Sequence, residues 1–150
     1  MKLAFGCDHA GYEAPEPFYA PEIIEYLESL GHSVEHVGTY GPDSVDYPDF
    51  AARVCARILD HSADLGILLC GTGMGISIAA NRHKGIRAAA CVTEKMVRLA
   101  RDHNNANILC VGSRVSTLEE CKVLIKLFLE TGFSGGERHQ RRIDKLDSLC

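Results

Sequence analysis

Apolar runs and segments of helical periodicity alternate along most of the chain. Five apolar runs are short enough to be buried strands, over residues 2–7, 33–38, 65–70, 86–92 and 107–112. Apolar residues recur with i, i+3, i+4 spacing over residues 21–31, 47–60, 74–82, 93–103 and 117–132. Because short connections between alternating strands and helices favour right-handed crossovers, the pattern predicts a doubly wound α/β fold. This fold is a parallel five-stranded sheet with helices on both faces.

Local signals refine the ends of these elements. Thr117 followed by Glu120 predicts a capping box at the start of the last long helix. A proline-rich segment, residues 13–21, follows the first strand, and a helix tolerates proline only in its first turn. We therefore expect a loop rim there and a helix that begins near Pro21. Residues 137–150 predict a basic, amphipathic helix with no strand to return to, which we expect to pack on a partner subunit.

The overall composition fits one domain over residues 1–150 and excludes several classes of protein. The chain is 46% hydrophobic and 24% charged, with a formal net charge of −4, which argues against general binding to nucleic acid or anionic membranes. No apolar run is long enough to span a bilayer and no cleavable signal is present, so we expect a cytoplasmic protein. The seven cysteines show no C-x-x-C spacing, which favours buried thiols over disulfides or zinc ligands.

Candidate chemistry follows several of the predicted strands. In a doubly wound sheet, ligands bind at the carboxyl ends of the strands, near the point where strand order reverses. We expect one edge of the sheet to gather the residues that follow strands 1, 3 and 5, the end of the fourth helix and the tail: Asp8, His9, Cys70, Arg114, His103, Asn104, Arg138, His139, Arg141 and Arg142.

The sequence "CGTGMG" after the third strand is the most informative stretch. A dinucleotide-binding fingerprint would need a small residue where Ile76 stands, and no P-loop lysine follows. What remains is a glycine loop, residues 71–75, that leads into a helix whose free N–H groups favour an anion. That anion is either a phosphate or an oxyanion that develops during a reaction.

Cys70 directly precedes this loop. A helix N-terminus favours the thiolate form of a nearby cysteine, and Thr72 is placed to bond the sulfur or a substrate oxygen. A thiolate beside anion-binding amides suits nucleophilic attack or removal of a proton next to a carbonyl, whereas the alternative is a structural cysteine at a strand end. Arg138 and Arg142, one helical turn apart, suit either phosphate binding or a solvated surface.

Six sequence blocks resemble one known family. The blocks "DHAGY", "SVDYPDFA", "CGTGMGISIAANR", "GIRAAAC", "HNNANILCVGSR" and "GERHQRRI" occur in order over nearly the whole chain. They are similar to the ribose-5-phosphate isomerase B family, which includes galactose-6-phosphate and allose-6-phosphate isomerases. The resemblance implies an aldose–ketose isomerase of the pentose phosphate pathway without metal or cofactor. It also implies a homodimer or a dimer of dimers, with active sites between subunits.

The same resemblance implies roles for individual residues. Cys70 would move a proton between C2 and C1 through a cis-enediol, His103 would open the furanose ring, and Asp8 would orient sugar hydroxyls. The enediolate oxygens would be held by the glycine loop: Gly71, Thr72, Gly73, Met74 and Gly75. The phosphate would be held by His9, Arg114, Arg138 and Arg142, and the sugar would be lined by Asn104 and Tyr47.

Three positions distinguish this chain within the family. Ile76 stands where some members have a glutamate base, so the chain resembles the cysteine branch. We expect the proline-rich segment to give the rim a different shape. Asn105 stands where many relatives have an aspartate, and we expect this difference to alter the support of His103. The alternatives are the same chemistry on a six-carbon phosphosugar, a dinucleotide-binding oxidoreductase and a non-catalytic phosphosugar sensor.

Overall fold

The computed structural model of the protein describes residues 1–149. Within that range one parallel sheet has the strand order β2-β1-β3-β5-β4. Its strands are β1 (Lys2–Cys7), β2 (Ser33–His36), β3 (Leu65–Cys70), β4 (Ala88–Ala90) and β5 (Ile108–Gly112). The chain passes from β1 outward to β2, whereas β3 lies on the other side of β1, so strand order reverses between β1 and β3.

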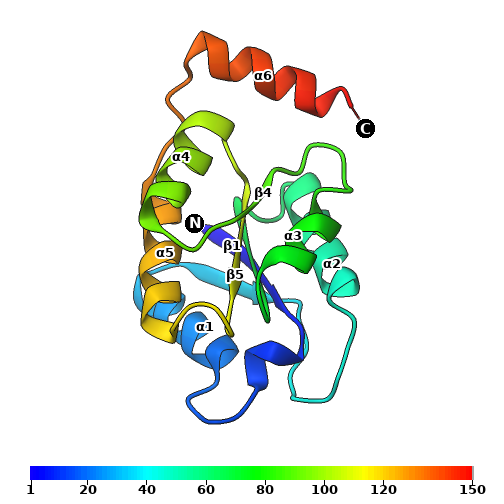
Figure 1. Ribbon diagram of the computed structural model, residues 1–150, viewed down its shortest axis with the longest axis vertical. Coiled ribbons are helices and arrows are strands. Elements are labelled where there is room, and N and C mark those ends of the chain that lie inside the picture. The colour runs from blue at the N-terminus through cyan, green and yellow to red at the C-terminus, as the bar shows by residue number, and fades with distance from the viewer. Residues whose placement is uncertain (150) are drawn as a thin grey trace.

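Helices cover both faces of the sheet, which confirms the doubly wound prediction (Figure 1). They are a short 3₁₀ turn η1 (His9–Tyr12), α1 (Tyr19–Ser29), α2 (Tyr47–Leu59), α3 (Met74–Ala80), α4 (Glu94–Asn104), α5 (Leu118–Glu130) and α6 (Glu137–Asp147). One face packs on α1, α4 and α5, and the other on α2 and α3. Strand side chains alternate between the faces, so Leu69 lies in the first core and Cys70 in the second.

The predicted strands and helices are all present, and their ends differ by a few residues. Helix α1 begins at Tyr19, so Pro21 lies in its first turn, as its missing N–H requires. Strand β4 is confined to 88–90 instead of 86–92, and just before it the Arg87 N–H donates to the Asn107 side chain instead of to a neighbouring strand. Strand β2 ends at His36, and Gly38 then packs against the backbone of Cys7, where a Cβ would lie 2.4 Å from the Cys7 nitrogen.

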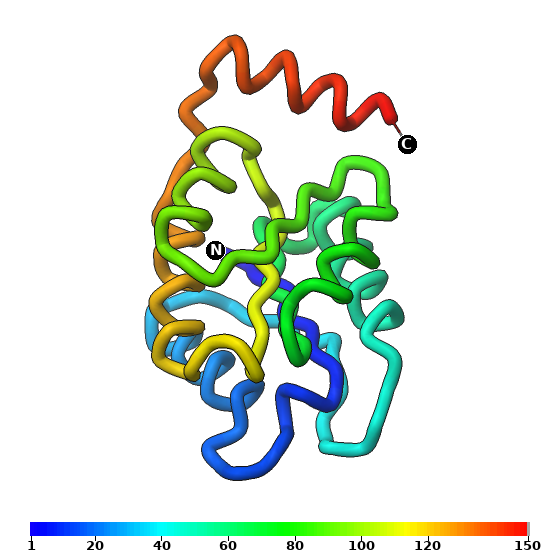
Figure 2. The backbone as a smooth tube through the Cα atoms, in the orientation of Figure 1, coloured from blue at the N-terminus to red at the C-terminus, as the bar shows by residue number. Residues whose placement is uncertain are grey.

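Helix α6 lies across the end of the molecule near which α4 finishes (Figure 2). Ile143 is buried, and Asp147 accepts a hydrogen bond from Arg87 Nη1 at 3.2 Å. The helix ends at Asp147, short of the predicted 150, and Cys150 lies outside the described residues. No helix among residues 1–149 has both the length and the apolar character needed to cross a membrane.

The capping box at α5 provides a test of local stability. Thr117 Oγ1 accepts the Glu120 N–H at 3.2 Å, and Glu120 Oε2 accepts the Thr117 N–H at 2.7 Å. We expect Thr117→Ala to lower the free energy of unfolding by about 1 kcal/mol, because it leaves a first-turn amide without its side-chain partner. Urea unfolding measures the change, with Glu119→Ala in the same turn as control. Equal stability of the two variants would contradict the assignment.

Candidate active site

A cavity of about 270 Å³ lies at the carboxyl ends of β1, β3 and β5. Because β1 and β3 are paired, with Cys7 opposite Leu69, the next residues of both strands emerge side by side at the point where strand order reverses. The cavity is lined by Asp8, His9, Tyr47, Cys70, Gly71, Thr72, Gly75 and Arg114. Eight of the residues singled out in the sequence therefore come together in one chain.

The Cys70 sulfur faces the glycine loop. Its side chain is only 4% exposed but lines the cavity, and Sγ accepts the N–H of Gly73 at 3.1 Å. Gly73 has φ +78°, a left-handed conformation that L side chains rarely adopt, and this turn directs its N–H back to the sulfur. A backbone donor held on a sulfur stabilises negative charge there.

Two other glycines of the loop allow side chains to lie close over it. A Cβ at Gly71 would lie 2.9 Å from Arg114 Nη1, and one at Gly75 would lie 2.9 Å from the Tyr47 hydroxyl. Ile76, in contrast, is fully buried in the α2/α3 core. The missing side chains at Gly71 and Gly75 thus leave room on the cavity side of the loop for the Arg114 guanidinium and the Tyr47 phenol. Ile76 contributes only to core packing.

Thr72 and Met74 occupy less central positions than the sulfur. Thr72 lines the cavity, and its Oγ1 accepts the Met74 N–H at 3.3 Å, which fixes the loop but places no described hydrogen bond between Thr72 and Cys70. The Met74 side chain is 60% exposed. The sequence predicted a hydrogen bond from Thr72 either to the Cys70 sulfur or to a substrate oxygen. The bond to the substrate oxygen stays a prediction.

Asp8 and His9 are oriented by local backbone amides. Asp8 is buried, and its Oδ1 caps the 3₁₀ turn by accepting the Ala10 N–H at 2.9 Å. Burial raises the pKa of the Asp8 carboxyl, an effect that the Ala10 N–H and the charges of His9 and Arg114 oppose. His9 Nδ1 accepts the Val45 N–H at 3.3 Å, so a neutral His9 ring carries its proton on Nε2.

The other described cysteines are packing residues. Cys7, Cys55, Cys91, Cys110 and Cys121 are free and buried. Burial raises the pKa of Cys7, Cys55 and Cys121 to about 12 and that of Cys91 to about 11, so these thiols stay protonated at neutral pH. The expectation that most cysteines act as small buried hydrophobes is confirmed for these five.

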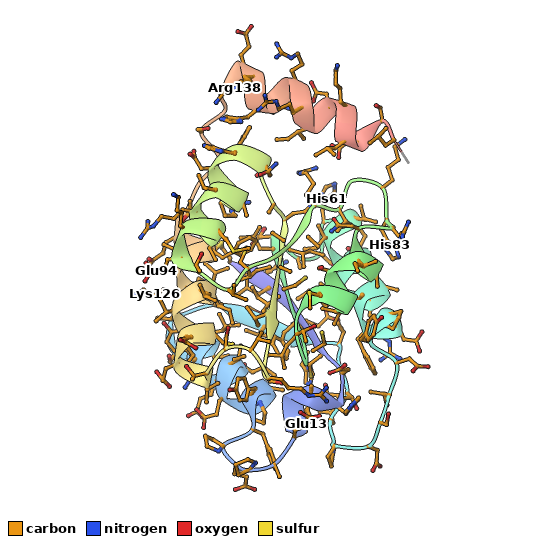
Figure 3. All side chains as sticks on the ribbon, viewed as in Figure 1. Glu13, His61, His83, Glu94, Lys126 and Arg138 are labelled. Atoms are coloured by element: carbon orange, nitrogen blue, oxygen red, sulfur yellow. The ribbon has the colours of Figure 1, made fainter. Side chains whose placement is uncertain are left out.

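The expectation that His103, Asn104, Arg138 and Arg142 lie at the same edge as Cys70 is wrong within one chain. Helix α4 runs antiparallel to the strands, so its last residues, His103 and Asn104, lie at the amino-terminal edge of the sheet. Helix α6 follows it there, and Figure 3 shows Arg138 and Glu13 at opposite ends of the molecule. Glu13 contacts Arg114 of the Cys70 cavity, so one chain carries two separate halves of the predicted site.

The second half has its own organisation. His103 Nε2 lies 3.3 Å from Asp102 Oδ2, and its ring stacks on that of His139 with centroids 4.2 Å apart. Partial desolvation and the positive charges of His103, Arg138 and Arg142 lower the pKa of His139. Asn105, whose backbone φ is +45°, accepts a hydrogen bond from Arg101 Nη1, whereas Asp102 is the carboxylate beside the His103 ring. The effect of Asn105 on His103 stays a prediction.

Sequence reasoning missed Asp102 and Glu13. Asp102 directly precedes His103, and a carboxylate beside a candidate acid was a usable signal. Glu13 lies 101 positions from its partner Arg114, and no local pattern links the two.

Comparison with known proteins finds matches over nearly the full length of the chain. A model of the ribose/galactose isomerase family matches residues 3–146. The chain belongs to this family of isomerases. It is 40% identical over 148 residues to ribose-5-phosphate isomerase B of Escherichia coli K12, covering 99% of this chain and 95% of that protein. Membership favours isomerase chemistry over a dinucleotide-binding oxidoreductase.

Solved structures of family members have the same fold. A ribose 5-phosphate isomerase of Thermotoga maritima matches with TM-score 0.92 at 50% identity, covering 99% of this chain and 98% of that one. Ribose-5-phosphate isomerase B of Mycoplasma genitalium, with bound ribulose-5-phosphate, matches with TM-score 0.89 at 42% identity, covering 98% and 94%.

Among residues 1–149, no three His, Cys, Asp or Glu side chains come together in a way that could hold a metal ion. Function without metal or cofactor stays a prediction.

The raised pKa of Asp8 predicts how stability depends on pH. Between the ordinary pKa of a free aspartate and the raised value, the folded chain holds the Asp8 proton more tightly than the unfolded chain. The contribution of Asp8 to the free energy of unfolding is therefore largest at low pH, and it decreases as pH rises through the raised pKa. We expect Asp8→Asn, which keeps the Ala10 acceptor, to become progressively more stable relative to the unaltered protein as pH rises from the ordinary pKa of a free aspartate through the raised pKa of Asp8.

Urea unfolding at several pH values measures this difference. Asp43→Asn, at an exposed aspartate, is the control. A stability difference for Asp8→Asn that is flat, or that shrinks as pH rises, would show that Asp8 is not buried as described.

Proposed function

We propose that this protein interconverts D-ribose 5-phosphate and D-ribulose 5-phosphate by proton transfer through a cis-enediol, with Cys70 as the base. The observation that carries the proposal is the Cys70 sulfur, which lines a cavity and accepts a backbone N–H from the glycine loop. The E. coli and T. maritima relatives carry the name of this activity.

The proton transfer follows from the arrangement of the cavity. In the open-chain aldose, the Cys70 thiolate removes the proton from C2, a C1–C2 double bond forms, and the former C1 carbonyl oxygen takes the charge. Transfer of the hydroxyl proton from O2 to O1, and return of the carbon-bound proton from the Cys70 thiol to C1, give the ketose with its carbonyl at C2 and regenerate the thiolate. Thr72 and the amides of the glycine loop hold the charged oxygen, and the buried Asp8 orients the sugar hydroxyls.

In this proposal the active site combines groups from two copies of the chain. His9 and Arg114 bind the phosphate from the Cys70 side, and Arg138 and Arg142 of the second copy bind it from the other. His103 of that copy opens the furanose ring. Asn104 of the same copy and Tyr47 of the Cys70 chain line the sugar. In this proposal residues 1–150 are one isomerase domain, active in the cytoplasm as a homodimer or a dimer of dimers.

An exposed apolar face supports this assembly. Helices α3 and α4 flank the edge strand β4 (Figure 1). Exposed apolar side chains on and between them are Met74, Ile78, Val92, Met96 and Leu99. On α6, Leu146 is 47% exposed, and beyond its end Leu149 is 78% exposed. Burial of these groups against a second copy would remove their apolar surface from water and give the C-terminal helix its partner.

The same chemistry on a six-carbon phosphosugar is the second candidate, because the family description covers both ribose and galactose isomerases. Turnover on ribose 5-phosphate, allose 6-phosphate and galactose 6-phosphate, measured side by side, distinguishes the two. A preference for either six-carbon substrate would replace the pentose assignment and leave the chemistry unchanged.

Cys70→Ala tests the function directly. We expect kcat to fall by about 10³-fold or more, because the base is removed, while binding of inorganic phosphate changes less than about twofold. Cys55→Ala, a buried thiol on the same face of the sheet, is the matched control and should keep kcat. Near-normal turnover of Cys70→Ala would refute the assignment of the base. Phosphosugar binding without turnover in the unaltered protein would favour the sensor alternative.

A further inference from the structure

An ion pair links the proline-rich rim to the cavity. Glu13, the first residue after the 3₁₀ turn that carries His9, accepts hydrogen bonds from Arg114 Nε at 3.0 Å and from Arg114 Nη2. Hydrogen bonding to Arg114 lowers the pKa of the Glu13 carboxyl, so Glu13 is ionised at neutral pH. The pair joins segments that are 101 residues apart and follow two different strands.

Glu13 approaches Arg114 from outside the Cys70 cavity. Arg114 lines that cavity and also a neighbouring hollow of about 400 Å³, which Glu13, Pro15 and Pro17 line as well. Glu13 is absent from the described lining of the Cys70 cavity. A guanidinium has five N–H donors, of which Glu13 engages one at Nε and one at Nη2, while Nη1 lies over Gly71.

The rim that carries Glu13 is itself restrained. Pro15 and Pro17 have fixed φ angles, which reduces the number of conformations open to the segment. The ring centroids of Tyr12, just before the rim, and Phe18, after the two prolines, lie 6.1 Å apart. At the start of α1, the Tyr19 hydroxyl donates to the Ser116 carbonyl at 3.0 Å, two residues beyond Arg114. The rim is thus attached twice to the segment that follows β5.

We propose that Glu13 is a positioning residue that holds the Arg114 guanidinium with its unengaged edge toward the cavity, ready for the phosphate of the substrate. This inference rests on the proposed function, in which Arg114 binds phosphate. The Arg114 side chain is 55% exposed and would otherwise have to be ordered each time substrate binds. The proline-rich rim thereby acquires a function, which is to present the carboxylate that fixes this arginine.

Steady-state kinetics of Glu13→Ala and Glu13→Gln test the role. We expect the KM for ribose 5-phosphate and the inhibition constant of inorganic phosphate to rise by about 3- to 10-fold in Glu13→Ala, the cost of ordering one long side chain. We expect kcat to stay within about twofold, because the reacting atoms are untouched. Glu13→Gln, which keeps an acceptor, should lie between. Glu16→Ala, at an exposed carboxylate of the same rim, is the matched control and should leave KM unchanged.

The double variant separates positioning from general damage to the rim. In an Arg114→Ala background, Glu13→Ala should have no further effect on KM. An equal rise in both backgrounds, or an unchanged or lower KM in Glu13→Ala alone, would overturn the inference, and a lower KM would mean that Glu13 competes with phosphate. If Arg114→Ala itself leaves KM unchanged, the phosphate-binding part of the proposed function fails as well.

Discussion

The direction of the chain in a parallel sheet is the constraint on which the rest of the site depends. All five described strands point the same way, so every residue that follows a strand emerges at one edge, and every residue at the end of a crossover helix emerges at the other. Asp8, Cys70 and Arg114 belong to the first group, and His103 belongs to the second. The thiol and the candidate ring-opening acid therefore lie at opposite edges of the same sheet.

The glycine loop adds specific contacts to this placement. Its turn at Gly73 directs a backbone N–H to the Cys70 sulfur, and the bare backbone at Gly71 leaves room for Arg114. A side chain at Gly71 would displace the Arg114 guanidinium, and a larger residue at Gly73 would disfavour the left-handed backbone conformation of the turn. The charged groups are in turn held by hydrogen bonds: the Ala10 N–H of the same turn holds Asp8, and Glu13, 101 residues away, holds Arg114.

The sequence was sufficient for the fold and for the half of the site that strands deliver. Hydrophobic periodicity located each described strand to within a few residues, and the glycine loop after β3 indicated where Cys70 would face. His103 lies at the opposite edge because α4 runs antiparallel to the strands, so a residue at the end of this helix and a residue at the end of a strand emerge at different edges. The sequence did not predict the Glu13–Arg114 pair, since no periodic or local pattern connects residues brought together only by contact of the rim with the segment that follows β5.

In the proposed assembly, complete active sites form only when the Cys70 edge of one copy meets the His103 edge of another. Hybrid dimers provide the most direct test: Cys70→Ala and His103→Ala chains are produced together with different affinity tags, and the mixed dimer is isolated. In a two-fold dimer with shared sites, one site of the hybrid carries both substitutions and the other carries neither. The hybrid should therefore have about half the activity of the unaltered dimer, although each parent is nearly inactive. Activity no higher than that of the parents would contradict the shared site.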